Sequence, residues 1–212
     1  EELSFSEYRR TTPSQNPHWW EPHRSRRQMR DKVASFDRYL GTPETAEHRV
    51  FTWLKHPVLA DKSVIVICRG DDVAFGILHS RIHECWATRI GNRMGQGNQR
   101  RYNSSFVFET FPFPGGLTPN IPASEYANDP RAIAIANAAR ELNVKREVWL
   151  NPPEWVERVP EVVAGYPDRI VPKDEDAAKK LKDRTLTKLY NERPAWLDHL
   201  HKTLDAAVAA AY

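Results

Sequence analysis

Apolar residues recur at helical spacing near the start of the chain. Neighbouring members of the set are three or four positions apart, which places them on one face of a helix: Met29, Val33, Phe36 and Leu40. Gly41 and Pro43 follow, and both residue types commonly end helices. We therefore expect one amphipathic helix over 24–40, ending at Gly41, within an N-terminal helical arm that spans about 1–41.

The pattern changes after Pro43 to short segments that are typical of strands. These segments are rich in β-branched and aromatic residues and are bounded by residues that favour turns, such as Arg69-Gly70-Asp71-Asp72. The run that follows this turn is apolar again, so we expect it to return as the second strand of a hairpin. We place the strands at 48–54, 63–68, 73–78 and 106–109.

Helical spacing reappears between the expected strands and again in the C-terminal half. Ile82, Trp86 and Ile90 are four residues apart and predict a helix over 79–90, which Gly91 ends. Asn128 or Asp129 caps a second, alanine-rich helix in which Pro130 occupies the first turn. Two last helices, separated by Pro194, are expected at 174–190 and 194–211.

These elements together predict the α+β fold class. We expect a small mixed sheet with packed helices over residues 1–114 and a helical C-terminal region over 115–212. No apolar run approaches the roughly 20 residues that a membrane helix needs, and the first residues lack the pattern of a secretory signal. Two cysteines exclude a disulfide-based scaffold. We therefore expect a cytoplasmic protein without a membrane partner.

Positive charge is concentrated in one window of the chain. The net charge is only +3, but residues 79–111 contain five basic residues, all of them arginine, against two acidic ones. Arginine has a planar guanidinium that binds guanine and phosphate through two parallel hydrogen bonds, which lysine cannot do. This window is therefore where a nucleic-acid contact would be expected.

The segment 91–105 within this window combines three residue types that suit DNA. Arginines pair with guanine and asparagine or glutamine with adenine in the major groove, while serine and backbone N–H groups suit phosphate oxygens. Glycines allow the backbone to approach a ligand closely. A solvated surface loop would explain the same composition, and the residues alone leave both interpretations open. The relevant side chains are Asn92, Arg93, Gln96, Asn98, Gln99, Arg100, Arg101, Asn103, Ser104 and Ser105.

Several longer motifs occur in a fixed order and give the sequence a family resemblance. They run through nearly the whole chain: Trp20-Glu21-Pro22-His23, His48-Arg49-Val50-Phe51, Phe75 to Trp86, Arg101-Tyr102, Phe108 to Pro114, Trp149 to Trp155 and Arg184 to Trp196. In order and spacing the chain resembles the C-terminal part of MmeI-like class I S-adenosylmethionine-dependent DNA methyltransferases. That part comprises the target recognition domain and the helices that follow it.

The resemblance implies a DNA-binding role for particular residues. In that family the base-recognising side chains precede the Arg-Tyr marker, and a second recognition stretch lies about 35 residues earlier, here near Arg69. It also implies double-stranded DNA and a methyltransferase domain of the parent polypeptide as partners. The cofactor S-adenosylmethionine would belong to that parent domain, with none bound by this segment. The expected DNA-binding residues are Arg69, Arg81, Asn92, Arg93, Asn98, Gln99, Arg100, Arg101, Tyr102 and Ser104.

Two other motifs could suggest catalysis or metal binding, and we expect neither activity from them. Asn151-Pro152-Pro153 resembles an amino-methyltransferase motif, but Glu154 occupies the position of the aromatic residue that stacks on the flipped base. We expect a proline turn there that leads into a short helix, and no catalytic residue. His79 and His83 have the spacing of zinc ligands but lack further ligands of suitable geometry, so we expect no metal site.

The aromatic residues and the start of the helix over 79–90 also carry expectations. We expect seven aromatic side chains to be core residues rather than base-stacking surfaces: Trp53, Phe75, Trp86, Phe106, Phe108, Phe111 and Phe113. We expect Cys85 to pack inward with Trp86, and His79, Ser80, Arg81 and His83 to face the loop or DNA in part.

The sequence therefore predicts a DNA recognition segment of a site-specific adenine-N6 DNA methyltransferase. This segment would bind duplex DNA and position the target base for a catalytic domain that it does not contain. Two alternatives stay open: a separate DNA-binding specificity subunit, and a protein-interaction module in which the arginine loop is passive.

Overall fold

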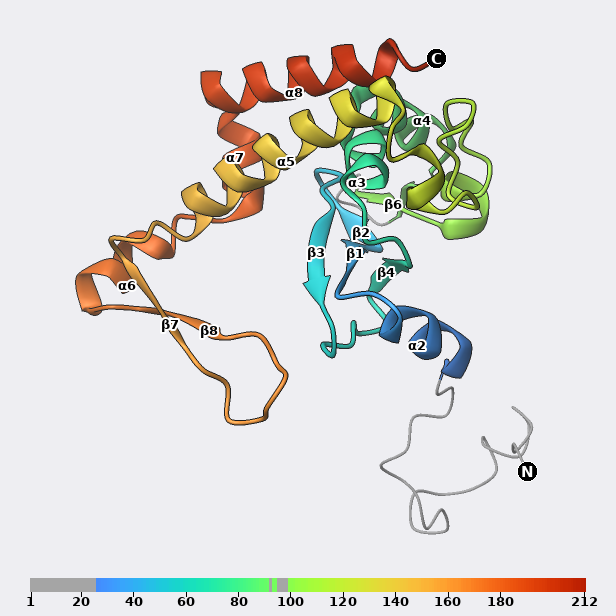
Figure 1. Ribbon diagram of the computed structural model, residues 1–212. Coiled ribbons are helices and arrows are strands. Elements are labelled where there is room, and N and C mark those ends of the chain that lie inside the picture. Colours follow the sequence, from blue (N-terminus) through green and yellow to red (C-terminus); the bar gives the residue numbers. More distant parts are fainter. Residues whose placement is uncertain (1–25, 92, 95–98) are drawn as a thin grey trace.

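The computed structural model describes residues 26–91, 93–94 and 99–212, and its fold is α+β as expected (Figure 1). Small antiparallel sheets occupy the first half, and long helices dominate the second half. Among the described residues, no helix is both long enough and apolar enough to cross a bilayer. The predicted N-terminal arm lies largely outside the described residues.

The helix expected over 24–40 is much shorter in the structure. Helix α2 spans Arg27–Ala34, and the chain then enters strand β1 at Arg38–Pro43. Leu40 is therefore a strand residue, fully buried and paired with Trp53 on one side and Ile67 on the other. The prediction was wrong here because a central strand with hydrogen-bonding partners on both edges outweighs a local helical spacing.

Strand β1 is the centre of a three-stranded antiparallel sheet with the order β3-β1-β4. Strand β3, Thr52–Lys55, is a shorter version of the strand expected at 48–54, and β4, Val64–Ile67, confirms the strand expected at 63–68. A side chain at Gly41 would come within 2.8 Å of the Leu54 side chain, so Leu54 packs over the space that Gly41 leaves open.

The segment that was expected to be a returning strand is a helix. Helix α3 spans Asp72–His79 and is capped by the preceding Asp71, whose carboxylate accepts a hydrogen bond from the backbone N–H of Ala74. An apolar run of this length fits a buried helix as well as a buried strand, and the Asp71 cap decides between them. Helix α4, Arg81–Ile90, is capped by Ser80 and confirms the helix predicted over 79–90.

A second small sheet follows, in the order β2-β6-β5. Its strands are β2, Thr45–Ala46, β5, Arg93–Met94, and β6, Gln99–Arg101. The strand expected at 106–109 is instead a single π-helical segment, η1, at Ser104–Phe108. Asn103 precedes η1, and its side-chain oxygen accepts a hydrogen bond from the N–H of Ser105 at 2.9 Å, which favours a helical turn over an extended chain.

The C-terminal region is helical, with one hairpin inserted. After the short 3₁₀ helix η2, Ala123–Tyr126, helix α5 spans Pro130–Leu150 and is capped by Asp129, as predicted. The helix expected over 174–190 is two helices, and the chain continues after Pro194 into the predicted last helix. The remaining elements are β7 (Val156–Val159), β8 (Arg169–Pro172), α6 (Glu175–Leu181), α7 (Leu186–Glu192) and α8 (Ala195–Ala209).

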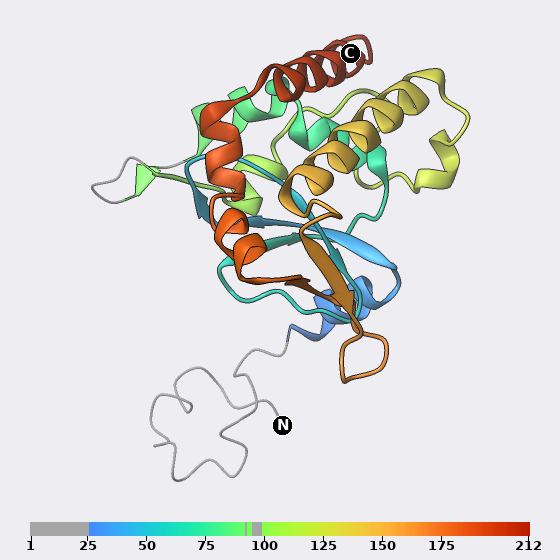
Figure 2. The same ribbon diagram turned by 90° about the vertical axis from the view of Figure 1, so that its left-hand side faces the viewer.

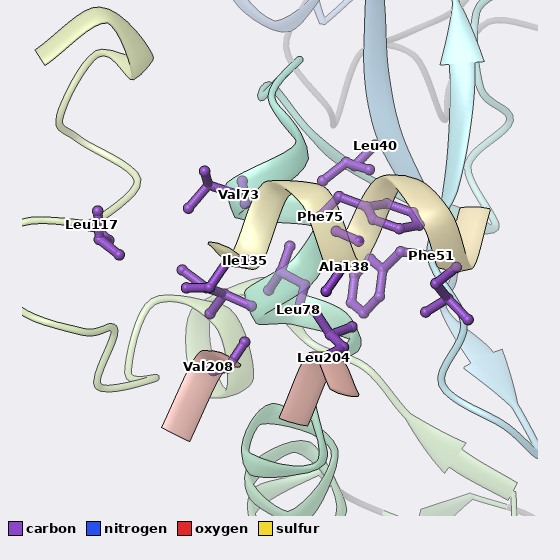
Figure 3. Close-up of a cluster of buried hydrophobic side chains, with 14 of the residues drawn as sticks. Leu40, Phe51, Val73, Phe75, Leu78, Leu117, Ile135, Ala138, Leu204 and Val208 are labelled. Atoms are coloured by element: carbon purple, nitrogen blue, oxygen red, sulfur yellow. The ribbon is translucent and has the colours of Figure 1, made fainter. Parts of the chain in front are cut away.

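Helix α3 is the centre of the hydrophobic core, where α5 and α8 both pack against it (Figure 3). Gly76 of α3 lies where a side chain would come within 2.7 Å of Ile135 on α5 and 3.1 Å of Leu204 on α8. One continuous cluster of buried side chains includes residues on both sides of position 114, from Leu40 to Ala211. The division into a recognition domain and a helical region stays a prediction, and the two regions share this core.

Candidate DNA-recognition surface

The arginine-rich segment forms a two-stranded ribbon that projects from the body of the protein (Figure 2). Strands β5 and β6 pair antiparallel, with Arg93 opposite Arg100. Strand β6 also pairs with β2, and the backbone N–H of Tyr102 bonds the carbonyl of Glu44 at 2.7 Å, which fixes the base of the ribbon.

A pocket of about 180 Å³ lies at the base of the ribbon and is lined by three arginines, Arg49, Arg100 and Arg101, together with Glu47 and Glu84. The Nη1 atom of Arg100 is buried and has no hydrogen-bond partner among the described residues. An unpaired buried donor is costly, so this guanidinium is available to an acceptor that enters the pocket.

Arg49 supports the ribbon from beneath. Its Nη2 donates to the carbonyl of Arg100 at 3.0 Å, and its Nη1 donates to the hydroxyl of Thr42 at 3.0 Å. Its guanidinium lies over the ring of Tyr102, 4.9 Å from the ring centroid. Burial lowers the pKa of Arg49 to about 10, so this side chain stays positively charged at neutral pH. Arg49 was not among the expected site residues, because it lies 51 positions from Arg100 in the sequence.

Arg101 is held by an acidic neighbour. Its Nε donates to Glu44 Oε1 at 2.6 Å, and a second nitrogen of the same guanidinium is also paired with that oxygen. The Arg101 side chain is 42% exposed, so the pair faces solvent. Glu44 therefore orients Arg101 and also neutralises part of its charge. Glu44, like Arg49, was not among the expected site residues, because it lies 57 positions from Arg101.

Tyr102 lies beneath the surface rather than on it. It is buried, and its hydroxyl lies 3.0 Å from Nε2 of His83. Burial raises the pKa of Tyr102 and lowers that of His83 to about 4, so both side chains are neutral at pH 7. Nδ1 of His83 then donates to the carbonyl of Leu78 at 2.8 Å. Tyr102 thus anchors the end of β6 in the core.

The expected orientation of the α3–α4 junction was wrong for four residues, whereas Arg81 is exposed and Trp86 packs against the core as expected. His79, Ser80 and His83 are all buried, whereas Cys85 is exposed. Nε2 of His79 accepts hydrogen bonds from Phe51 N–H at 3.1 Å and from Arg146 at 2.9 Å, which leaves this nitrogen unavailable to a metal. Among the described residues, no three His, Cys, Asp or Glu side chains gather where they could hold a metal ion.

Arg69 does not join the ribbon. Its guanidinium donates to the carbonyls of Pro119 and Ile121 at 2.8 and 2.7 Å, bonds Asp71 at 2.8 Å and pairs with the Tyr126 hydroxyl. The Arg69 side chain is only 11% exposed. Its donors are therefore used to fix the segment 119–126 against the start of α3.

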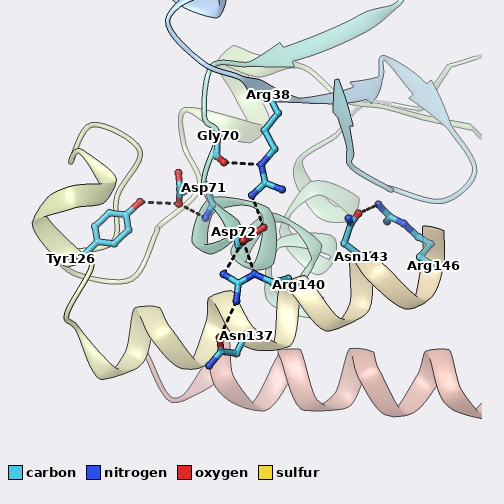
Figure 4. A network of polar contacts seen from close by, with 10 residues as sticks. Arg38, Gly70, Asp71, Asp72, Tyr126, Asn137, Arg140, Asn143 and Arg146 are labelled. Carbon is cyan, nitrogen blue, oxygen red and sulfur yellow. Dashed lines mark hydrogen bonds and ion pairs between the residues drawn. The ribbon is translucent and has the colours of Figure 1, made fainter. Parts of the chain in front are cut away.

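The acidic residues at the start of α3 extend this network (Figure 4). Asp71 accepts from the Tyr126 hydroxyl at 2.9 Å, and Asp72 pairs with Arg38 at 2.9 Å and Arg140 at 3.1 Å. These contacts tie β1, α3 and α5 together. The stretch 69–72 is therefore a structural junction between the two halves of the chain.

The remaining predicted site residues lie on the ribbon, at the starts of α4 and η1, or outside the described residues. Arg81 and Ser104 are exposed, at the first residues of α4 and η1. Arg93 and Gln99 lie in the ribbon strands, while Asn92 and Asn98 fall outside the described residues. Arg93, Gln99, Arg100 and Arg101 are thus brought together in one ribbon.

The Asn151-Pro152-Pro153 motif forms a turn, as expected. The N–H of Trp155 bonds the carbonyl of Pro152 at 2.9 Å, and Asn151 ends α5. The turn leads into strand β7 rather than into the short helix that was expected.

Comparison with known families identifies the class of protein. The family described as "MmeI, target recognition domain" matches residues 5–115, a little over half of the chain. The matched residues contain the ribbon, the pocket and the sheet that supports them. The chain belongs to this family and contains the target recognition domain of an MmeI-type DNA methyltransferase. Comparisons with curated proteins and with solved structures give no match.

Proposed function

We propose that this chain binds duplex DNA and reads its base sequence with the β5–β6 ribbon. The observation that carries the proposal is the ribbon itself, which is two-stranded, projects from the body and places Arg93 opposite Arg100. The major groove of B-DNA is wide enough for a two-stranded ribbon and presents a different donor and acceptor pattern for each base pair. Four residues of the ribbon strands are base-contact candidates, namely Arg93, Gln99, Arg100 and Arg101, with Asn92 and Asn98 beside them in the sequence.

Phosphate contacts position such a ribbon without specifying sequence. Arg81 and Ser104 are exposed and are the candidates for this role. Arg69 and Tyr102 support the framework, because their polar groups are already bonded within the chain. The proposed interface thus separates residues that touch DNA from residues that hold them in place.

We further propose that the parent polypeptide methylates adenine at N6. The methyl donor, S-adenosylmethionine, and the catalytic residues would lie in a methyltransferase domain of that polypeptide. The target base is inaccessible inside a duplex and must leave the stack. The role of the present chain is to hold the duplex in register while the base moves. On its own, the chain therefore binds DNA and methylates nothing.

The first experiment measures DNA binding and its dependence on salt. Fluorescence anisotropy with a randomised duplex is recorded between 50 and 200 mM salt, values at which phosphate contacts produce a steep loss of affinity. Arg100→Ala combined with Arg101→Ala is expected to weaken binding by at least about tenfold. The matched control is Arg158→Ala combined with Arg169→Ala, which removes the same charge from the β7–β8 hairpin and leaves binding nearly unchanged.

The outcomes separate the proposal from its alternatives. Equal binding by the wild type and the Arg100/Arg101 variant would overturn the assignment of the ribbon. Binding to a protein partner without measurable DNA affinity would favour the interaction-module hypothesis. Methylome sequencing of cells that carry the complete gene tests the adenine-N6 assignment, because altered ribbon arginines must abolish or change the modified sequence.

A further inference from the structure

Phe106 is the exposed exception in a cluster of aromatic side chains. It is 63% exposed, although its spacing predicted a core position. Phe108, Phe111 and Phe113 come from the same stretch and pack on one another, with ring centroids 4.8 to 5.6 Å apart. Trp86 joins them at 6.3 Å from Phe111. The Phe106 ring therefore does not take part in this aromatic core.

The backbone that carries Phe106 is firmly anchored on both sides. Val107 is completely buried, and its carbonyl accepts a hydrogen bond from Trp86 Nε1 at 3.1 Å. The N–H of Val107 bonds the carbonyl of Asn103 at 2.8 Å, and the N–H of Glu109 bonds that of Ser104 at 2.9 Å. The backbone that presents the exposed ring is therefore fixed, which reduces the entropy that ordering this segment on a ligand would cost.

Phe106 is continuous with the proposed DNA surface. Phe106 lines a small cavity of about 30 Å³ together with Arg101, Asn103 and Ile90. Ile90 is itself 40% exposed, and Arg89 beside it is exposed as well. Among residues 101–109 the acidic residue is Glu109, which directly follows η1. An apolar surface bordered by arginines fits a base stack with its flanking phosphates better than it fits an acidic or purely apolar partner.

We propose that Phe106 is a stacking residue that inserts its ring against the bases at the edge of the recognised sequence. This inference rests on the proposed function and deepens it. Proteins that deform DNA insert apolar side chains between base steps and so unstack them. A base that must leave the helix for methylation is released more easily where stacking is already weakened. Phe106 would act as a positioning residue and makes no contact with the methyl donor.

The test uses a duplex that the wild-type chain selects from a randomised pool. 2-Aminopurine is placed at successive positions along this duplex, since its fluorescence rises when a neighbouring base unstacks. The wild type is expected to raise the signal at one step. Phe106→Ala is expected to abolish that rise and to weaken binding by about tenfold, within the range for loss of one base stack. Phe106→Trp keeps a flat aromatic ring, so it is expected to retain both the fluorescence rise and the wild-type affinity.

Two controls keep the result interpretable. Tyr166→Ala removes an aromatic side chain that is 44% exposed near the β7–β8 hairpin, and it should change neither signal nor affinity. The salt dependence of binding should be the same for Phe106→Ala and the wild type, because the phosphate contacts are kept.

The outcomes distinguish this inference from the function on which it rests. Wild-type affinity and an unchanged 2-aminopurine rise in Phe106→Ala would overturn the stacking role and leave the ribbon assignment intact. If the wild type selects no duplex, the proposed function fails and the inference fails with it.

Discussion

The guanidinium of Arg146 lies 2.9 Å from Nε2 of His79, and both side chains are buried in the core. The pKa of His79 is lowered well below 6.5, first by burial and then by the adjacent charge of Arg146, so His79 is neutral and accepts the hydrogen bond. Arg146 also donates to the carbonyl of Phe51 at 2.9 Å. A buried cation on α5 is thus bonded to α3 and to the segment that leads into β3.

Arg146 is expected to be essential for stability. In Arg146→Ala, the loss of packing and of these hydrogen bonds should lower the free energy of unfolding by about 3 kcal/mol. Arg146→Met keeps much of the volume but leaves the Phe51 carbonyl without its donor, so about 1–2 kcal/mol should be lost. Urea denaturation at pH 7 measures both values. A methionine variant as stable as the wild type would show that the hydrogen bonds do not offset the cost of burying the charge.

Acid is expected to destabilise the protein through its buried histidines. Burial lowers the pKa of His83 and of His201 to about 4, whereas a histidine in the unfolded chain has a pKa near 6.5. The unfolded state therefore binds protons first as the pH falls. The stabilisation is complete above pH 6.5 and is lost progressively down to about pH 4.

The pH prediction is checked by urea denaturation at intervals between pH 7.5 and 4.5. His201→Gln should flatten the dependence, because it removes one of the shifted groups while glutamine can still bond the Tyr190 hydroxyl. The same pH dependence in the variant and the wild type would exclude His201 as a contributor.

Gly76 is expected to resist even the smallest substitution. Its α-carbon faces Ile135, Ala139 and Leu204, and an added Cβ would lie within 2.7 to 3.1 Å of them. Gly76→Ala should therefore destabilise the protein by about 1–3 kcal/mol, although alanine is intrinsically the better helix former by about 1 kcal/mol. Thermal denaturation tests this directly.

A double-variant cycle identifies the cause. Ile135→Ala should cost less in the Gly76→Ala background than in the wild type, because the two side chains compete for one space. Additive costs would show that α3 and α5 are not in tight contact at this position.

Glu44 is expected to restrain DNA binding. Its carboxylate pairs with Arg101, so Glu44→Gln should release the guanidinium and remove a charge that repels phosphate. We expect affinity for duplex DNA to rise by about fivefold at low salt, with a smaller gain as salt screens the charges. Anisotropy titrations measure the change.

The control for Glu44→Gln is Glu161→Gln, which removes the same charge from a residue paired with Arg169 near the β7–β8 hairpin. Equal gains in the two variants would point to net charge rather than to the Glu44–Arg101 pair.

Local signals in the sequence were sufficient for elements that carry their own caps. Asp129 with Pro130 marks a helix start that the structure confirms, and the spacing of Ile82, Trp86 and Ile90 predicted α4. Leu40 was misplaced because its environment is set by strands β3 and β4, which lie further along the chain. The exposure of Phe106 likewise depends on how the neighbouring aromatics pack, which spacing alone does not determine.

The positive charge of the candidate site was predictable from the sequence, but the residues that hold the ribbon in place were not. Clustered arginines drew attention to the segment 91–105 from composition, but its pairing as strands β5 and β6 was not predicted. The contacts of Arg49 and Glu44 with that ribbon join residues 51 or more positions apart, so no local pattern reveals them. Arg69 carries the right charge for DNA, but its carbonyl partners at 119 and 121 could be found only from the fold.

The core shared across position 114 has a practical consequence for engineering new sequence preferences. If residues 1–114 replaced the same region of a relative, α3 of this chain would pack against that relative's own counterparts of α5 and α8. The close approach at Gly76 leaves little room for differences in the side chains that face it. Exchange of the ribbon between Gly91 and Arg101 avoids that contact altogether. Chimaeras with altered specificity are therefore best built by swapping the short projecting segment while the scaffold beneath it stays native.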